Sequence, residues 1–110
     1  MAELEVDGDE LVVRLGPWER IGTLRTSDVR VSRRSITATR QVDRAHREVR
    51  GLRAPGTGLP GRILIGTWLR RGGKDFVAVS GKGPGVVIEL RGERFDRIVT
   101  TAPVPSEIQA

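Results

Sequence analysis

A loop rich in glycine and proline lies in the middle of this chain and constrains its fold more than any other stretch. It runs from Gly51 to Gly61 and holds four Gly and two Pro. Neither residue type suits a helix interior, and glycine is favoured where the backbone takes shapes that other residues avoid. The loop leads directly into the apolar stretch RILIGTW, residues 62–68, and Gly72-Gly73 then predicts a turn into a second strand. The chain is therefore expected to be a meander of strands.

Alternating apolar residues predict strands along the rest of the chain. Leu4 and Val6 alternate with acids up to the turn Asp7-Gly8-Asp9, and the alternation resumes after it, which predicts a β-hairpin. Further strands are expected at 29–31, 36–42, 63–69, 74–80, 85–91 and 95–100. Because these strands follow one another without a long crossover, we expect a mainly β fold, a bent antiparallel sheet or partly open barrel.

Short helical pieces are expected between the strands. GPWERIGTLR, residues 16–25, spaces Trp18, Ile21 and Leu24 so that they share one helical face. Asp43 is expected to cap a brief helical turn that Gly51 ends. Ser106 is expected to begin a C-terminal helix, which the few residues after it truncate.

Composition excludes several classes of chemistry. The chain has 110 residues, the size of one domain, and no cysteine, which excludes disulfides, thiolate metal sites and cysteine nucleophiles. The single histidine, His46, is interpreted as a surface residue. The acidic N-terminus lacks the apolar core of a signal peptide, and no apolar run approaches the roughly 20 residues that a membrane helix needs. We expect a cytoplasmic protein with no cofactor and no metal.

Charge is unevenly distributed along the chain. Residues 1–29 hold seven acids and three bases, whereas residues 30–53 hold eight Arg and two acids. The Arg-rich segment can be a solvated face that pairs with the acidic hairpin, or it can bind anions. The candidate anion-binding residues are Arg33, Arg34, Arg44, Arg47, Arg50 and Arg53. Exposed aromatic residues, which single-strand nucleic-acid surfaces use, are not expected, because Trp18, Trp68, Phe76 and Phe95 all occupy positions typical of a core.

Two glycine motifs resemble phosphate-binding loops without meeting their requirements. Residues 56–61 match G-x-G-x-x-G, but Pro60 and a strand follow where a phosphate site needs the start of a helix. Gly81-Lys82-Gly83 lacks the P-loop spacing and is interpreted as a hairpin turn. Several acids are expected at strand ends and turns, and nothing in their spacing indicates a catalytic pair: Asp75, Glu89, Glu93 and Asp96. An enzyme is the least expected class.

The segments described above resemble the bacterial pleckstrin-homology-like (PH-like) domains, especially small actinobacterial ones. The resemblance spans residues 3–102 and lies mainly in GLRAPGTGLPGRILIGTW followed by GGKDFVAV, GVVIEL and FDRIVTT. It implies a single domain, a seven-stranded bent sheet or partly open barrel closed at one end by a C-terminal helix. Residues 105–110 are too few for that helix, so the barrel end is expected to stay open or to be covered by a partner, as in a homo-oligomer.

These observations favour a non-catalytic binding or assembly module that engages a protein partner or copies of itself. Leu59 and Pro60 are candidate contact residues, because apolar residues on loops often serve binding. The alternative is electrostatic binding of an anionic membrane or nucleic acid through residues 30–53.

Overall fold

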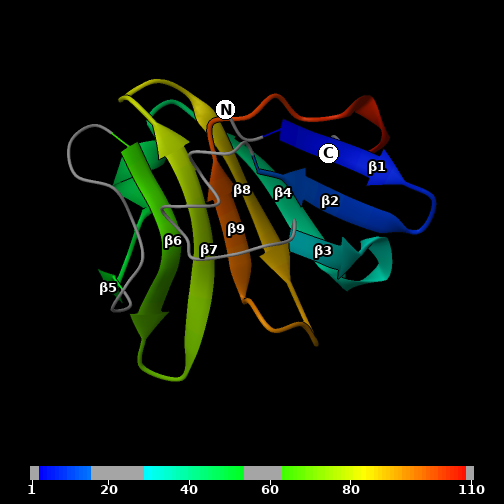
Figure 1. Ribbon diagram of the computed structural model, residues 1–110, viewed down its shortest axis with the longest axis horizontal. Coiled ribbons are helices and arrows are strands. Elements are labelled where there is room, and N and C mark those ends of the chain that lie inside the picture. The colour runs from blue at the N-terminus through cyan, green and yellow to red at the C-terminus, as the bar shows by residue number, and fades with distance from the viewer. Residues whose placement is uncertain (1–2, 16–28, 54–62, 109–110) are drawn as a thin grey trace.

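A computed structural model of the chain describes residues 3–15, 29–53 and 63–108. Their strands form two sheets (Figure 1). The first, in the order β1-β2-β3, contains β1 (Glu3–Asp7), β2 (Glu10–Arg14) and β3 (Val29–Ser32). The second, in the order β4-β8-β9-β7-β6-β5, contains β4 (Ile36–Val42), β5 (Leu52–Arg53), β6 (Ile63–Arg70), β7 (Gly73–Ser80), β8 (Gly85–Leu90) and β9 (Arg97–Thr100). The prediction of a mainly β fold is confirmed.

The predicted N-terminal hairpin is present. β1 and β2 pair antiparallel with Asp7 opposite Glu10, and Gly8 makes the turn with a φ of 60°. Leu4 and Val6 are half-buried on one side of β1, whereas the acids that alternate with them are exposed. β3 then pairs with β2, and the 3-10 helix η1 (Arg33–Ser35) carries the chain into β4 of the other sheet.

The last three strands depart from the expected meander. β9 lies between β7 and β8, parallel to β7 and antiparallel to β8, so the prediction of a purely antiparallel sheet is wrong at this point. The connection at residues 81–84 must pass over β9, a distance of about 10 Å, or two strand spacings. Four residues reach that far easily at about 3.3 Å each. Gly81-Lys82-Gly83 is therefore a crossover between unpaired strands rather than a hairpin turn.

Both faces of the six-stranded sheet are apolar, as the two-sided pattern of residues 63–69 predicts. Alternate residues of β7 divide between them, with Phe76 in the larger cluster and Val77 in the smaller. The larger cluster fills the space between the two sheets, where it includes Leu11 and Val29. The smaller cluster lies on the outer face, where Trp68 packs with Ala45. Trp68, Phe76 and Phe95 are buried, which confirms their predicted core positions.

The short helical pieces differ in detail from expectation. The turn after β4 is a 3-10 helix, η2 (Ala45–Glu48), with Arg44 at its N-cap and no side-chain cap, so the prediction that Asp43 caps it is wrong. Gly51 follows with a φ of 85°, and a Cβ there would collide with the carbonyl oxygen of Leu69. The C-terminal helix is reduced to η3 (Ser106–Ile108). The helix expected at 16–25 and most of the Gly/Pro loop lie outside the described residues.

Candidate functional site

The carboxylate of Asp75 is the most deeply buried acidic group among the described residues, with 1% of the residue exposed. It points into the smaller cluster, on the same face of β7 as Val77 and Val79. Its neighbour across the sheet is Arg97 of β9, which is also buried. The Nε of Arg97 donates a hydrogen bond to Oδ2 of Asp75 at 2.8 Å. The two charges are therefore neutralised at the point where β7 and β9 run parallel.

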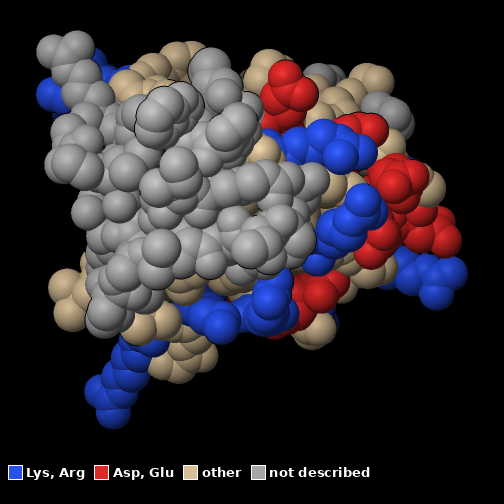
Figure 2. All heavy atoms as spheres, in the orientation of Figure 1, with Lys and Arg blue, Asp and Glu red and all other residues tan. Residues whose placement is uncertain are grey.

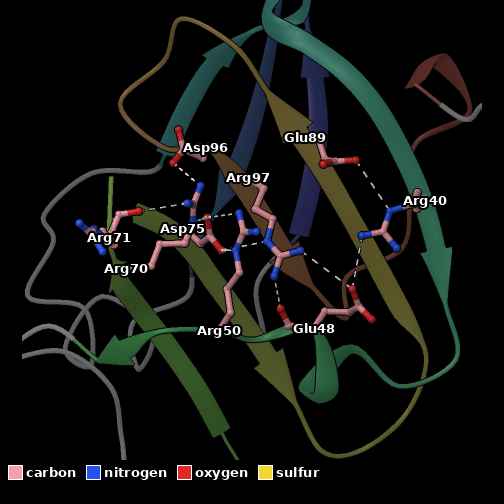
Figure 3. Close-up of polar contacts among 9 residues, drawn as sticks. All are labelled: Arg40, Glu48, Arg50, Arg70, Arg71, Asp75, Glu89, Asp96 and Arg97. Atoms are coloured by element: carbon pink, nitrogen blue, oxygen red, sulfur yellow. Dashed lines mark hydrogen bonds and ion pairs between the residues drawn. The ribbon is translucent and has the colours of Figure 1, made fainter. Parts of the chain in front are cut away.

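Two further guanidinium groups converge on the same carboxylate (Figure 3). Arg50 donates from Nε to Oδ2 of Asp75 at 2.8 Å and from a terminal nitrogen to Oδ1 at 3.3 Å. This hydrogen bonding raises the pKa of the Arg50 guanidinium. The Nε of Arg70 lies 3.8 Å from Oδ1 of Asp75, and its Nη2 donates to Oδ2 of Asp96 at 2.6 Å. We name Asp75, Arg97, Arg50, Arg70 and Asp96 the Asp75 cluster.

Glu48 and Arg40 extend the Asp75 cluster towards β4. A terminal nitrogen of Arg97 donates to the backbone carbonyl of Glu48, and Arg40 donates to the Glu48 carboxylate at 3.3 Å. The Nε of Arg40 also lies 3.8 Å from the carboxylate of Glu89. The extended network thus holds equal numbers of guanidinium and carboxylate groups. Because guanidinium donors occupy both oxygens of Asp75, this carboxylate is poorly suited to accept a proton from a substrate, and we interpret the cluster as a structural brace.

The spacing of the acids along the sequence does not reveal this cluster. Asp96 does lie in a turn, as expected, but Asp75 lies inside β7. A signal was available, since Asp75 shares its strand face with two valines and Arg97 shares its face with Val99. A charge on an apolar strand face must be neutralised when it is buried. Two opposite charges of that kind on different strands predict a pair.

The six candidate anion-binding arginines do not form one surface. Arg33 and Arg34 lie in η1 before β4, whereas Arg44 and Arg47 lie beyond its other end. A strand of the length of β4 separates two such ends by about 23 Å. Arg50 is engaged by Asp75, and the side chain of Arg53 lies outside the described residues.

The acidic hairpin does pair with part of the Arg-rich segment. Arg30 lies 3.4 Å from the carboxylate of Asp7 and 3.1 Å from that of Glu10. Its hydrogen bonds to Glu10, the larger effect, and to Asp7 raise the pKa of its guanidinium. Arg33 donates to the backbone carbonyl of Gly8 at 3.4 Å. These contacts correspond to the solvated, salt-bridged face that was one of the two interpretations of the segment.

Arg44 and Arg47 line a shallow hollow of about 280 Å³ together with Val42, Asp43 and Glu48. The two carboxylates in the same hollow reduce its attraction for an anion.

His46, on the same turn, is half-buried rather than a surface residue. Its Nδ1 is buried and finds no hydrogen-bond partner within the described part of the chain.

Two leucines are the exposed large apolar residues of the described structure. Leu52 of β5 is 78% exposed and Leu69 of β6 is 44% exposed. They are direct partners across the two strands, and Leu69 has Lys74 of β7 as its partner on the other side. Arg71 is exposed in the turn that follows. We name Leu52, Leu69, Arg71 and Lys74 the β5–β6 corner.

Leu59 and Pro60, predicted as contact residues, lie outside the described residues in the loop that separates β5 from β6.

The described residues show neither a metal-binding cluster nor a helix that could span a membrane. The described residues contain no group of three or more His, Cys, Asp or Glu placed to hold a metal ion. In the described ranges, no helix has the length and apolar character required to cross a membrane. Comparison with protein-family models, with curated proteins and with solved structures found nothing that matches this chain.

Proposed function

We propose that this chain is a non-catalytic assembly module that binds protein, copies of itself included, through the β5–β6 corner. The observation that carries the proposal is the adjacent pair of exposed leucines at one end of the six-stranded sheet, Leu52 on the short outer strand β5 and Leu69 on β6. Burying one leucine side chain contributes about 1.5–3 kcal/mol, so a partner that covers both gains appreciable affinity.

The position of the leucines on the sheet supports a contact surface. In β6, Leu69 lies on the same strand face as Ile65, which belongs to the larger core cluster. This face is buried at Ile65 and is exposed at Leu69 and Leu52. β5 pairs with only two of the eight residues of β6. Strands at a sheet edge that carry apolar side chains readily accept another chain.

The Asp75 cluster lies on the opposite face of the same strands and supports the corner. Arg70 follows Leu69 in β6, and Arg50 lies two residues before the start of β5. Their bonds to Asp75 and Asp96 tie both sides of the corner to the centre of the sheet. A contact surface that is fixed before binding loses less conformational entropy when the partner arrives. The brace therefore favours binding at this position.

The resemblance to PH-like domains is part of the proposal. It favours a PH-like bent sheet, and domains of this type generally bind partners rather than catalyse reactions. Where that pattern has a C-terminal helix, the described residues contain the 3-10 helix η3.

Sedimentation velocity over a range of protein concentrations tests the proposed function. We expect the wild-type chain to self-associate at concentrations up to about 500 µM, since small transient interfaces bind weakly. Leu52→Asp places a charge in the apolar contact and is expected to weaken this association at least about tenfold. Gln41→Asp is the matched control, because it adds the same charge to an exposed position on β4 at the other end of the sheet.

A wild-type chain that stays monomeric over the whole range would contradict the proposal. Equal self-association of wild type and Leu52→Asp would also contradict it, because the corner would then not be the contact. Thermal unfolding of each variant establishes that it is folded before the comparison is made.

A further inference from the structure

The β1–β2 hairpin and the β5–β6 corner carry opposite charge. The β1–β2 hairpin has exposed carboxylates at Glu3, Glu5, Asp7, Asp9 and Glu10. Arg14 lies in the hairpin and pairs with Glu5, while Arg30 of β3 and Arg33 of η1 bond to it. These five acids therefore outnumber the three bases. The β5–β6 corner carries Arg71 and Lys74 beside its leucines. Arg50 and Arg70 lie behind them and are paired with Asp75 and Asp96. Figure 2 shows acidic side chains gathered on the right of that view, where the hairpin lies, with basic side chains among them. Basic side chains also lie at the lower left, near the β6–β7 turn.

β1 has an apolar side and a charged side, and so does the sheet at the β5–β6 corner. One side of β1 carries Leu4 and Val6, which are half-buried against the larger core cluster, and the other carries three exposed carboxylates. The corner likewise has Leu52 and Leu69 on one face of the sheet. The guanidinium groups of Arg50 and Arg70, 43% and 30% exposed, lie on the other face. A strand like β1 placed beside β5 would set its apolar side next to Leu52. Its carboxylates would then meet the exposed parts of Arg50 and Arg70, which also bond to Asp75 and Asp96. β1 is itself the outer strand of its sheet.

We propose that the β5–β6 corner of one copy binds the β1–β2 hairpin of a second copy, so that the chain assembles head to tail. This inference rests on the proposed function and names its partner. Symmetric pairing is disfavoured, because two corners would bring like basic charges together and two hairpins would bring like acidic charges together. A head-to-tail contact uses two different surfaces of each copy. It therefore continues into an open chain of copies or closes into a ring.

Mixing two interface variants tests the proposal. The hairpin variant, Glu3→Lys with Glu5→Lys, keeps an intact corner, and the corner variant, Leu52→Asp with Arg71→Glu, keeps an intact hairpin. Sedimentation velocity is expected to show each variant alone as a monomer, with self-association weakened at least about tenfold. The equimolar mixture is expected to form a 1:1 dimer and nothing larger, because each copy has one working surface. Raising the salt concentration from about 50 mM to 500 mM is expected to weaken the dimer.

The outcomes separate this inference from the proposed function. If the hairpin variant self-associates like wild type while the corner variant is monomeric, the contact is corner to corner, and head-to-tail assembly is overturned while the proposed function stands. A mixture that stays monomeric also overturns it. A wild-type chain that never self-associates overturns both. Gln41→Lys, on β4, is the matched charge control. If the double hairpin variant does not fold by circular dichroism, Glu3→Lys alone replaces it, since Glu3 begins β1 and its substitution is the milder one.

Discussion

Replacing Asp75 with Asn tests whether the buried carboxylate holds the second sheet together. Asparagine keeps the shape of the side chain but removes the charge, and it exchanges one acceptor oxygen for an NH2 donor. In this structure that donor would face the guanidinium groups of Arg50 and Arg97, which donate to both carboxylate oxygens at 2.8–3.3 Å. Arg97 would be left as a buried cation, because only 7% of the residue is exposed.

Removing one partner of a buried ion pair typically costs about 3–5 kcal/mol, because the remaining charge stays buried. Hydrogen bonds to charged groups contribute about 1.5–3 kcal/mol each, and Asp75 accepts three of them, so the upper part of that range is expected. For a domain of this size, 1 kcal/mol changes Tm by about 4 °C, so the upper part of the range predicts a fall of about 16–20 °C. Differential scanning calorimetry or circular dichroism measures this change.

Asp96→Asn is the matched control for Asp75→Asn. Asp96 also accepts a short hydrogen bond from an arginine, Arg70, but its side chain is 41% exposed. Exposed pairs contribute about 0–1 kcal/mol, so this variant is expected to unfold within about 4 °C of wild type. If both variants lose stability equally, or if Asp75→Asn loses less than about 1 kcal/mol, burial does not control the strength of the cluster and the reasoning fails.

Two glycine positions give further predictions. Gly85→Ala places a Cβ against the Thr100 backbone and the Ala45 side chain, whereas Gly83→Ala meets nothing within 4 Å. Thermal unfolding should therefore show a loss of about 1–3 kcal/mol for Gly85→Ala and little change for Gly83→Ala, and equal losses would contradict the packing of β8 against η2. Gly51→Ala is expected to cost at least about 1 kcal/mol, because of its positive φ and the nearby β6 backbone, and to speed amide exchange in β5. Unchanged exchange there would show that Gly51 does not set the approach of β5 to β6.

Local patterns in the sequence predicted most strands correctly. Alternation located the hairpin at Leu4 and Val6, and the two-sided apolar pattern of residues 63–69 predicted a strand covered on both faces. Strand order was not predictable in the same way. β9 lies between β7 and β8 because each of these strands pairs with β9 rather than with the other. The short connection between β7 and β8 is compatible with direct pairing of the two strands and with the insertion of β9, so the sequence does not distinguish them.

The candidate site was only partly predictable from the sequence. The Arg-rich segment was visible as a run, but its arginines separate because β4 lies between its two ends and Asp75 holds Arg50. The exposure of Leu52 and Leu69 was not predictable, since an apolar residue in a strand is usually buried. This pair is exposed because the three-stranded sheet does not extend over it. The predicted contact at Leu59 and Pro60 stays a prediction.

Amide hydrogen exchange at two protein concentrations tests the central claim most directly. Comparing the wild-type chain at about 1 µM and about 300 µM, we expect added protection at residues 51–53 and 66–70, since a weak contact is occupied only at the higher concentration. Head-to-tail assembly adds protection at residues 3–7. Exchange in β4, at the other end of the sheet, is expected to stay unchanged. No added protection at the corner, or added protection only in β4, would contradict the assignment of the β5–β6 corner as the contact surface.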